Sequence, residues 1–160
     1  MRPIEFRGKD IKTGKWVYGP SVQINSHCYI VDEHALPVGI FYFDKPNGDR
    51  VNVISSLLGG LIPVIPETVG QFTGLKDKNG KKLYVHDIIT LSYGVPPITA
   101  TLVIEYAENE EVADGVFVSG WWMRNIRPGG ISASLCQAYH DDIIKIGDIH
   151  TNPELLEQES

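Results

Sequence analysis

The segment from Glu67 to Ile89, ETVGQFTGLKDKNGKKLYVHDII, constrains the fold of this chain more than any other part. At its centre, Asn79-Gly80 is the strongest short-range signal for a β-hairpin, because both central residues of a type I′ turn need a positive φ. Asparagine tolerates that conformation and glycine adopts it freely. Apolar and polar residues then alternate from Leu83 to Tyr93, which is typical of a strand with one buried face. The segment therefore predicts a type I′ hairpin that leads into a longer strand.

Short alternating or β-branched runs, separated by turn signals, recur along the rest of the chain. Turns are indicated at Thr13-Gly14, at Pro46-Asn47-Gly48 and at Arg127-Pro128-Gly129-Gly130. The acid-rich stretch from Glu108 to Gly115 predicts an exposed loop. Helical periodicity is not sustained, and Asn152-Pro153-Glu154 has the cap residue, proline and early acid of a short helical turn. We therefore expect a mainly β fold.

The length of the chain allows one domain or two small ones. At 160 residues, folding buries roughly 68–70% of the surface of the unfolded chain, so a core needs no disulfide or metal to support it. Pro63 and Pro66 impose an extended connector and mark the best boundary between subdomains. We expect a β subdomain over residues 1–66, and a second β subdomain with a short helical tail over residues 67–160.

The lack of a membrane span and of a signal-peptide pattern in this sequence predicts a cytoplasmic protein. The longest apolar run, Leu57 to Ile65, is too short to cross a bilayer and contains proline, so we expect no membrane contact. The first ten residues, MRPIEFRGKD, have no apolar stretch of the signal-peptide type. Cys28 and Cys136 lie far apart and outside any CxxC pair. In the cytosol we expect two free, partly buried thiols, with a disulfide as the alternative.

The charge distribution gives one candidate interaction surface. The net charge of −6 disfavours nucleic-acid binding, because an acidic surface repels the phosphate backbone. Four lysines gather around the predicted turn and oppose this trend: Lys76, Lys78, Lys81 and Lys82. They suit a solvated hairpin tip that resists edge-to-edge pairing, or alternatively a phosphate-binding patch. Trp121 and Trp122 complete the candidate surface, although we expect one in the core and the other partly exposed.

The sequence contains no catalytic constellation. Its histidines stand at positions 27, 34, 86, 140 and 150, without the ligand spacing that a zinc site requires. Cys28 follows His27 directly, but adjacency in sequence does not supply the geometry of a nucleophile and its base. The P-loop and GxGxxG patterns are absent. We therefore predict a non-enzymatic protein with no cofactor and no metal. The enzymatic alternative centres on His86, His140 and Asp141.

Three blocks of the sequence carry a family resemblance: Ile4 to Tyr18, Glu67 to Ile89, and Ile146 to Leu156. They resemble the YopX-like proteins, which are found mostly in phages and prophages, whereas the region between Pro20 and Pro66 carries little resemblance. The resemblance implies a phage-borne, mostly β protein whose C-terminal part is an SH3-like barrel. It implies no catalytic residues, because none are established for the family.

One position departs from the family pattern. Members often have Glu-Gly where this chain has Val85-His86. If that glycine takes a positive φ, His86 has to adopt the left-handed conformation, or the local turn must differ.

The leading hypothesis is a phage or prophage accessory protein in the cytoplasm of a bacterial host. It would act through contacts with an unknown phage or host protein and through self-association as a homo-oligomer. One alternative is a nucleic-acid-binding protein that uses the Lys76–Lys82 hairpin. The other is the enzyme centred on His86.

Overall fold

The computed structural model describes residues 4–32, 40–44, 50–54, 60–113, 116–135 and 141–157. Within these ranges the fold is mainly β, as predicted, and helical structure is confined to short 3-10 turns such as η1 (Pro66–Thr68) and η3 (Pro153–Leu156). None of the described helices is long and apolar enough to span a membrane. The chain forms two compact units, unit 1 (Pro3–Val69) and unit 2 (Gly70–Ser160), and the predicted connector ends next to their boundary.

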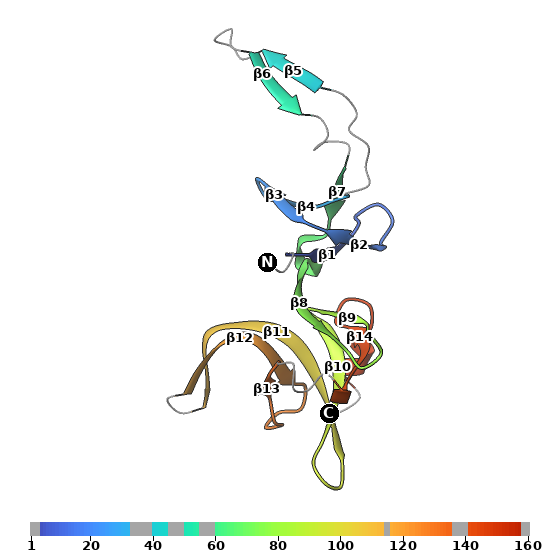
Figure 1. The fold of residues 1–160 in the computed structure, drawn as a ribbon, viewed down its shortest axis with the longest axis vertical. Helices are drawn as coiled ribbons and strands as arrows, with labels where there is room; N and C mark the ends of the chain where they lie inside the picture. The colour runs from blue at the N-terminus through green and yellow to red at the C-terminus, as the bar shows by residue number, and fades with distance from the viewer. Residues whose placement is uncertain are drawn as a thin grey trace. The chain divides into compact units, whose positions relative to one another are not determined.

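Unit 1 is built from short antiparallel strands (Figure 1). β1 (Phe6–Lys9) pairs with β2 (Trp16–Gly19), which confirms the hairpin expected around Thr13-Gly14. A three-stranded sheet has the order β3-β4-β7, and β5 pairs with β6. Their bounds are Ser21–Ile24 for β3, His27–Val31 for β4, Ile40–Asp44 for β5, Arg50–Ile54 for β6 and Leu61–Val64 for β7. The turn predicted at Pro46-Asn47-Gly48 lies outside the described residues.

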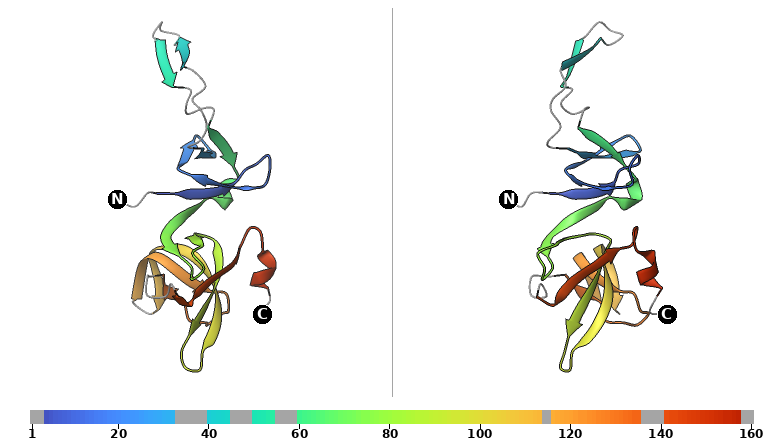
Figure 2. Two further views of the ribbon diagram at one scale, coloured as in Figure 1. Left: turned by 45° about the vertical axis from the view of Figure 1, so that its right-hand side comes forward. Right: turned by 90° about the vertical axis from the view of Figure 1, so that its right-hand side faces the viewer.

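Unit 2 contains a hairpin and a five-stranded antiparallel sheet (Figure 2). The hairpin consists of β8 (Gly70–Lys76) and β9 (Lys82–Tyr84), as predicted. The sheet has the order β13-β12-β11-β10-β14, in which β14 returns from far along the chain to pair with β10. The bounds are Asp87–Tyr93 for β10, Ile98–Ala113 for β11, Val116–Asn125 for β12, Ala133–Ser134 for β13 and Ile143–Asp148 for β14. The described strands leave this sheet open, with no pairing between β13 and β14, and the SH3-like barrel remains a prediction.

The turn between β8 and β9 is not the predicted type I′ turn. Of its residues Lys78, Asn79 and Gly80, only Gly80 has a positive φ, of 78°. The NH of Gly80 donates to the carbonyl oxygen of Asp77 over 2.9 Å, and a second bond joins the NH of Asp77 to the carbonyl of Lys81. This is the pattern of a three-residue loop in which a left-handed glycine follows a tight turn. The prediction failed because Asp77 sets the turn: its Oδ1 accepts the NH groups of Asn79 and Lys81.

The acidic stretch is also not the predicted loop. β11 continues through it as far as Ala113, with Glu110 opposite Val118 and Glu111 opposite Phe117 on β12. β11 and β12 together form a two-stranded ribbon, and the register between them is irregular near Asn109, which has a φ of 50°. This irregularity separates the inner part of the ribbon, which contributes to the core, from its outer part. Pairing with β12 satisfies the backbone hydrogen-bonding groups of this stretch, whereas its side-chain pattern alone gave no signal for a strand.

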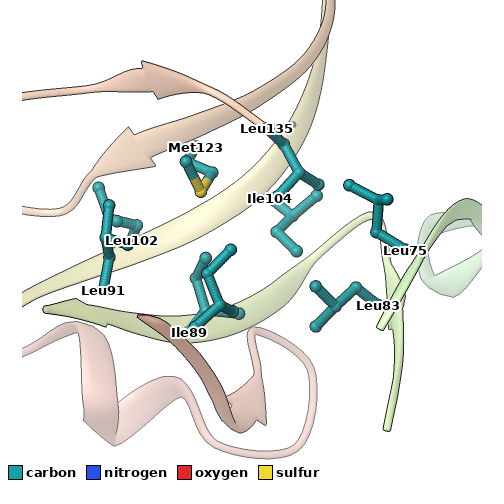
Figure 3. Packing of buried hydrophobic residues seen from close by; sticks show 9 residues of the cluster. Leu75, Leu83, Ile89, Leu91, Leu102, Ile104, Met123 and Leu135 are labelled. Atoms are coloured by element: carbon teal, nitrogen blue, oxygen red, sulfur yellow. The ribbon is translucent and has the colours of Figure 1, made fainter. Parts of the chain in front are cut away.

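One apolar cluster forms the core of unit 2 (Figure 3). It joins the hairpin to the sheet through Leu75, Leu83, Ile89, Leu91, Leu102, Ile104, Met123, Leu135 and Ile143. Ile104 and Met123 lie opposite each other on β11 and β12 and are fully buried. Figure 3 shows Ile104 in the middle, with Leu75 and Leu83 of the hairpin on one side and Met123 on the other. Burial confirms the predicted alternation from Ile89 to Ser92, where Ile89 and Leu91 are buried and Thr90 and Ser92 are half-buried. It does not confirm the earlier part, because Tyr84 is buried although it was expected on the face opposite Leu83.

Candidate functional site

The core-facing side of β12 continues beyond the core as an exposed aromatic surface. Met123 is fully buried, Trp121 packs against the core cluster while half-buried, and Phe117 is 56% exposed. Side chains two or four residues apart leave a strand from the same face. Tyr106 lies opposite Trp121 on β11, with the two rings edge to face at 5.0 Å between centroids, and is 57% exposed. We call Tyr106, Phe117 and Trp121 the aromatic row.

An ion-pair network occupies the opposite face of the same ribbon. The Nε of Arg124 donates to Glu105 over 2.6 Å, and its Nη2 donates to Glu110 over 2.5 Å. Hydrogen bonds to the two carboxylates, assisted by their charge, raise the pKa of Arg124, so this guanidinium remains charged. The three side chains are 37–42% exposed, and surface pairs of this kind contribute little to stability. The network links Glu105 and Glu110 of β11 to Arg124 of β12, and its side chains are too exposed to form a buried reactive site.

Two hollows flank Arg124. The first has a volume of about 280 Å³ and is lined by Val103, Glu105, Arg124, Asn125, Ile126 and Leu156. The second has a volume of about 300 Å³ and is lined by Glu110, Glu111, Trp122, Arg124, Gly130 and Ser132. Ligand pockets usually hold roughly 300–1,000 Å³ and have mostly apolar walls. The first hollow lies just below this range although half of its lining residues are apolar, and the second lies at the lower limit with mainly polar and charged walls, so neither resembles a typical small-molecule site.

The structure separates the two tryptophans of the candidate surface. Trp121 belongs to the aromatic row, whereas Trp122 lines the second hollow on the other face of β12. Both are half-buried, and of the two Trp121 is the one that packs against the core cluster. Adjacent residues of a strand point to opposite faces, which means that the pair cannot form one continuous surface.

The four lysines of the candidate surface come together at the tip of the β8–β9 hairpin, where all of them are exposed. The ammonium group of Lys82 lies 5.4 Å from the ring centre of Phe72, within the range of a cation–π contact. We call the tip formed by Lys76, Lys78, Lys81 and Lys82 the lysine tip.

Asp77, the one acid in the segment that carries the lysine tip, points inward. Asp77 is completely buried, and its Oδ2 accepts the NH of Lys145 on β14 over 3.1 Å, in addition to the two bonds within the turn. Burial acts to raise the pKa of this carboxyl, but the three backbone NH groups outweigh it and hold the pKa below its ordinary value. The carboxylate is therefore an internal anchor of the hairpin, and the exposed surface of the tip is basic.

Unit 2 also brings together two histidines that are 64 residues apart in sequence. His86 lies between β9 and β10 with a φ of 73°, so it adopts the left-handed conformation considered above for this position. Its Nδ1 is 3.2 Å from the Nε2 of His150, which follows β14. Sequence reasoning missed this pair because it depends on the pairing of β10 with β14. The unusual residue in the turn was the one signal that drew attention to His86.

The enzymatic alternative is not assembled by the described residues. The register of β10 and β14 sets Asp87 opposite Asp148 and Leu91 opposite Ile143. His86 and Asp141 therefore flank opposite ends of β14, separated by roughly 17 Å at the usual rise of a strand. Asp141 is exposed, and His140 lies outside the described residues.

The other groups considered for metal or thiol chemistry also remain apart. Cys28 is a free, half-buried thiol in unit 1, as expected, whereas Cys136 lies outside the described residues. In the described part of the chain, no three or more His, Cys, Asp or Glu side chains gather as they would to hold a metal ion.

This chain is similar to solved structures and to a protein-family model. The crystal structure of protein EF1440 from Enterococcus faecalis is similar to this chain at 23% sequence identity and a TM-score of 0.44, covering 96% of this chain and 98% of that one. No curated protein matches. The family model described as YopX protein matches residues 5–157, which include most of both units. The chain therefore belongs to the YopX family.

Proposed function

We propose that this protein is a non-enzymatic accessory protein of a phage or prophage that acts through protein contacts and self-association. Its place of action in this proposal is the cytoplasm of the bacterial host. Membership of the YopX family supports the phage setting, because resemblance to that family implies a phage-borne protein. The observation that carries the contact role is the exposed aromatic row on β11 and β12.

The aromatic row has the chemistry of a contact surface. Tyr106 and Phe117 are each more than half exposed, although they extend the face of the ribbon that is buried further along. Aromatic side chains are enriched at the centres of protein interfaces, where they bury much area at a small cost in conformational entropy. A second copy of the chain would cover the row if the two rows packed against each other about a twofold axis. The ion-pair network would then remain in water on the opposite face of the ribbon.

Replacing the two most exposed aromatics tests this function. We expect the double variant Tyr106→Ser/Phe117→Ser to raise the dissociation constant of self-association at least tenfold, because truncating one aromatic hot spot costs about 2 kcal/mol or more and about 1.4 kcal/mol is a factor of ten. Sedimentation velocity over a wide range of protein concentrations measures this constant. The matched control is Ile98→Ser, since Ile98 is 58% exposed on the same strand but outside the aromatic row.

Two results would contradict the proposal. A wild-type protein that is monomeric at every concentration, and that also retrieves no phage or host protein from an extract of infected cells, has no contact function. If Ile98→Ser weakened self-association as much as the double variant does, the contact would lie elsewhere on unit 2 and not on the aromatic row.

Nucleic-acid binding by the lysine tip is the second candidate, and the inward position of Asp77 favours it. With that carboxylate buried, four exposed ammonium groups gather at one hairpin tip without an exposed acid within it. The net charge of −6 still opposes binding to a polyanion, so any affinity has to come from this local field.

Charge reversal in the lysine tip tests this candidate. We expect Lys81→Glu/Lys82→Glu to weaken any binding to single- or double-stranded DNA or RNA at low salt by more than tenfold. The slope of the logarithm of the binding constant against the logarithm of the salt concentration should also become shallower, by about one for each phosphate group that the variant no longer neutralises. Fluorescence anisotropy measures both quantities. Lys12→Glu/Lys15→Glu makes the same charge change at the exposed tip of the β1–β2 hairpin, and an equal effect there would mean that net charge alone is responsible.

A further inference from the structure

The side chains of His86 and His150 already have the spacing of two ligands to one metal ion. The Nδ1 of His86 and the Nε2 of His150 are 3.2 Å apart. Two imidazole nitrogens bound to zinc at its usual distance, in tetrahedral geometry, would be about 3.3 Å apart. An ion could therefore enter between the two rings with little change in the distance between the nitrogens.

The orientation of the rings also suits coordination. Their planes are inclined by 75° and their centroids are 5.1 Å apart. If each ring centre lay on the line through the two nitrogens, the centroids would be farther apart than this. The axis of a ring, drawn from its centre through the contacting nitrogen, is therefore inclined to the line that joins the nitrogens. Inclined axes are required for chelation, because an ion bound by both lone pairs lies off the line that joins the nitrogens.

Main-chain hydrogen bonds fix both histidines. The NH of His86 donates to the carbonyl of Ile104 over 2.8 Å, and its own carbonyl accepts the NH of Ile149 over 3.0 Å. These bonds hold His86 at a φ of 73°, a conformation that a residue with a Cβ rarely adopts. The NH of His150 donates to Oδ1 of Asp148, which also accepts the NH of Thr151. The rings thus project from two turns with restrained backbones.

The surroundings of the pair permit a cation. Both histidines are half-buried, so water can reach them and fill the remaining coordination positions. The β10–β14 pairing places two buried carboxylates, Asp87 and Asp148, opposite each other next to the histidines. Lys145 offsets one of them through an ion pair of 2.8 Å with Asp87.

We propose that His86 and His150 form a two-histidine site for a late first-row transition-metal ion, such as Zn²⁺ or Cu²⁺, with water in the open positions. Imidazole is a preferred ligand of both ions, and Cu²⁺ binds most tightly in the usual order of affinities. Without an ion, one ring donates a hydrogen bond to the other. When the ion binds, that proton moves to the other nitrogen of its ring or to solvent, and both contacting nitrogens become ligands. The site uses no residue of the aromatic row or the lysine tip, so it stands independently of both proposed functions.

Titration calorimetry of the untagged, metal-free, full-length protein with ZnCl₂, and separately with CuCl₂, tests the site. We expect one ion per chain at micromolar to millimolar concentrations, and at least a tenfold rise in the dissociation constant for His86→Gly and for His150→Gln. His86→Gly removes the ligand at a position whose φ suits glycine, so the variant should fold as well as the wild type. His27→Ala, which removes an exposed histidine from unit 1, should leave binding unchanged.

Thermal unfolding separates removal of the ligand from disruption of the fold. The melting temperature of the ion-free His86→Gly variant should equal or exceed that of the ion-free wild type. Added Zn²⁺ should raise the melting temperature of the wild type but not that of the variant. If His150→Gln fails to fold, the comparison of metal binding by His86→Gly and by the wild type is a sufficient test. The proposal is overturned if the wild type binds neither ion up to millimolar concentration, or if His86→Gly binds as tightly as the wild type.

Discussion

Replacement of Ile104 by alanine is expected to lower the free energy of unfolding of unit 2 by about 4 kcal/mol, within the usual range for a large aliphatic residue truncated in a core. Ile104 is fully buried in the cluster that joins the β8–β9 hairpin to the sheet. Its truncation removes packing on two sides, toward the leucines of the hairpin and toward Met123 (Figure 3). The close-packed neighbours can fill the space only in part, so a cavity remains.

Urea denaturation followed by tryptophan fluorescence measures this decrease in stability. A Trp16→Phe background confines the signal to unit 2, because the other two tryptophans, Trp121 and Trp122, both belong to it. The matched control is Ile98→Ala on the same strand: Ile98 is 58% exposed, so the same change should cost less than about 1 kcal/mol. Equal effects of the two substitutions would show that β11 does not face the core as described.

Replacement of Asp77 by alanine is expected to cost about 3 kcal/mol, the second largest effect. The carboxylate is fully buried and accepts three backbone NH groups, from Asn79, Lys81 and Lys145. A hydrogen bond to a charged group contributes roughly 1.5–3 kcal/mol to stability, and bonds that share one acceptor group do not add up in full. Alanine leaves all three donors without this acceptor and releases the hairpin from β14. Asp77→Asn retains one side-chain oxygen and should cost about half as much.

The effect of Asp77 should depend on pH. Because the folded state holds the pKa of this carboxyl below its ordinary value, the unfolded state binds more protons in the window between the two values. Its stabilisation is therefore fully present above the ordinary aspartate pKa of about 3.9, and is lost as the pH falls through the lowered value. The stability difference between the wild type and Asp77→Ala should be constant from pH 7 to about pH 5, and should narrow in more acidic solution. A difference that grows on acidification would contradict the proposed anchor.

Two errors of the sequence predictions have different causes. Asn79-Gly80 correctly indicated a hairpin, but the buried Asp77 fixed a different turn within it. The acids of β11 correctly indicated exposure, but pairing with β12 made a strand of the stretch expected to be a loop. The first error arose within the turn itself, where the Asp77 side chain overrides the type I′ preference of Asn79-Gly80. The second arose from pairing with β12, which the local side-chain pattern does not reveal.

The sequence by itself determined the mainly β fold, the β8–β9 hairpin and the exposed lysines at its tip. These features follow from alternation and turn chemistry, which act between residues close together in the chain. The tertiary structure alone decided that Trp121 joins Tyr106 while Trp122 faces the charged network, and that His86 meets His150. Such contacts are set by the register between distant strands, and a shift of one residue would send every side chain to the opposite face.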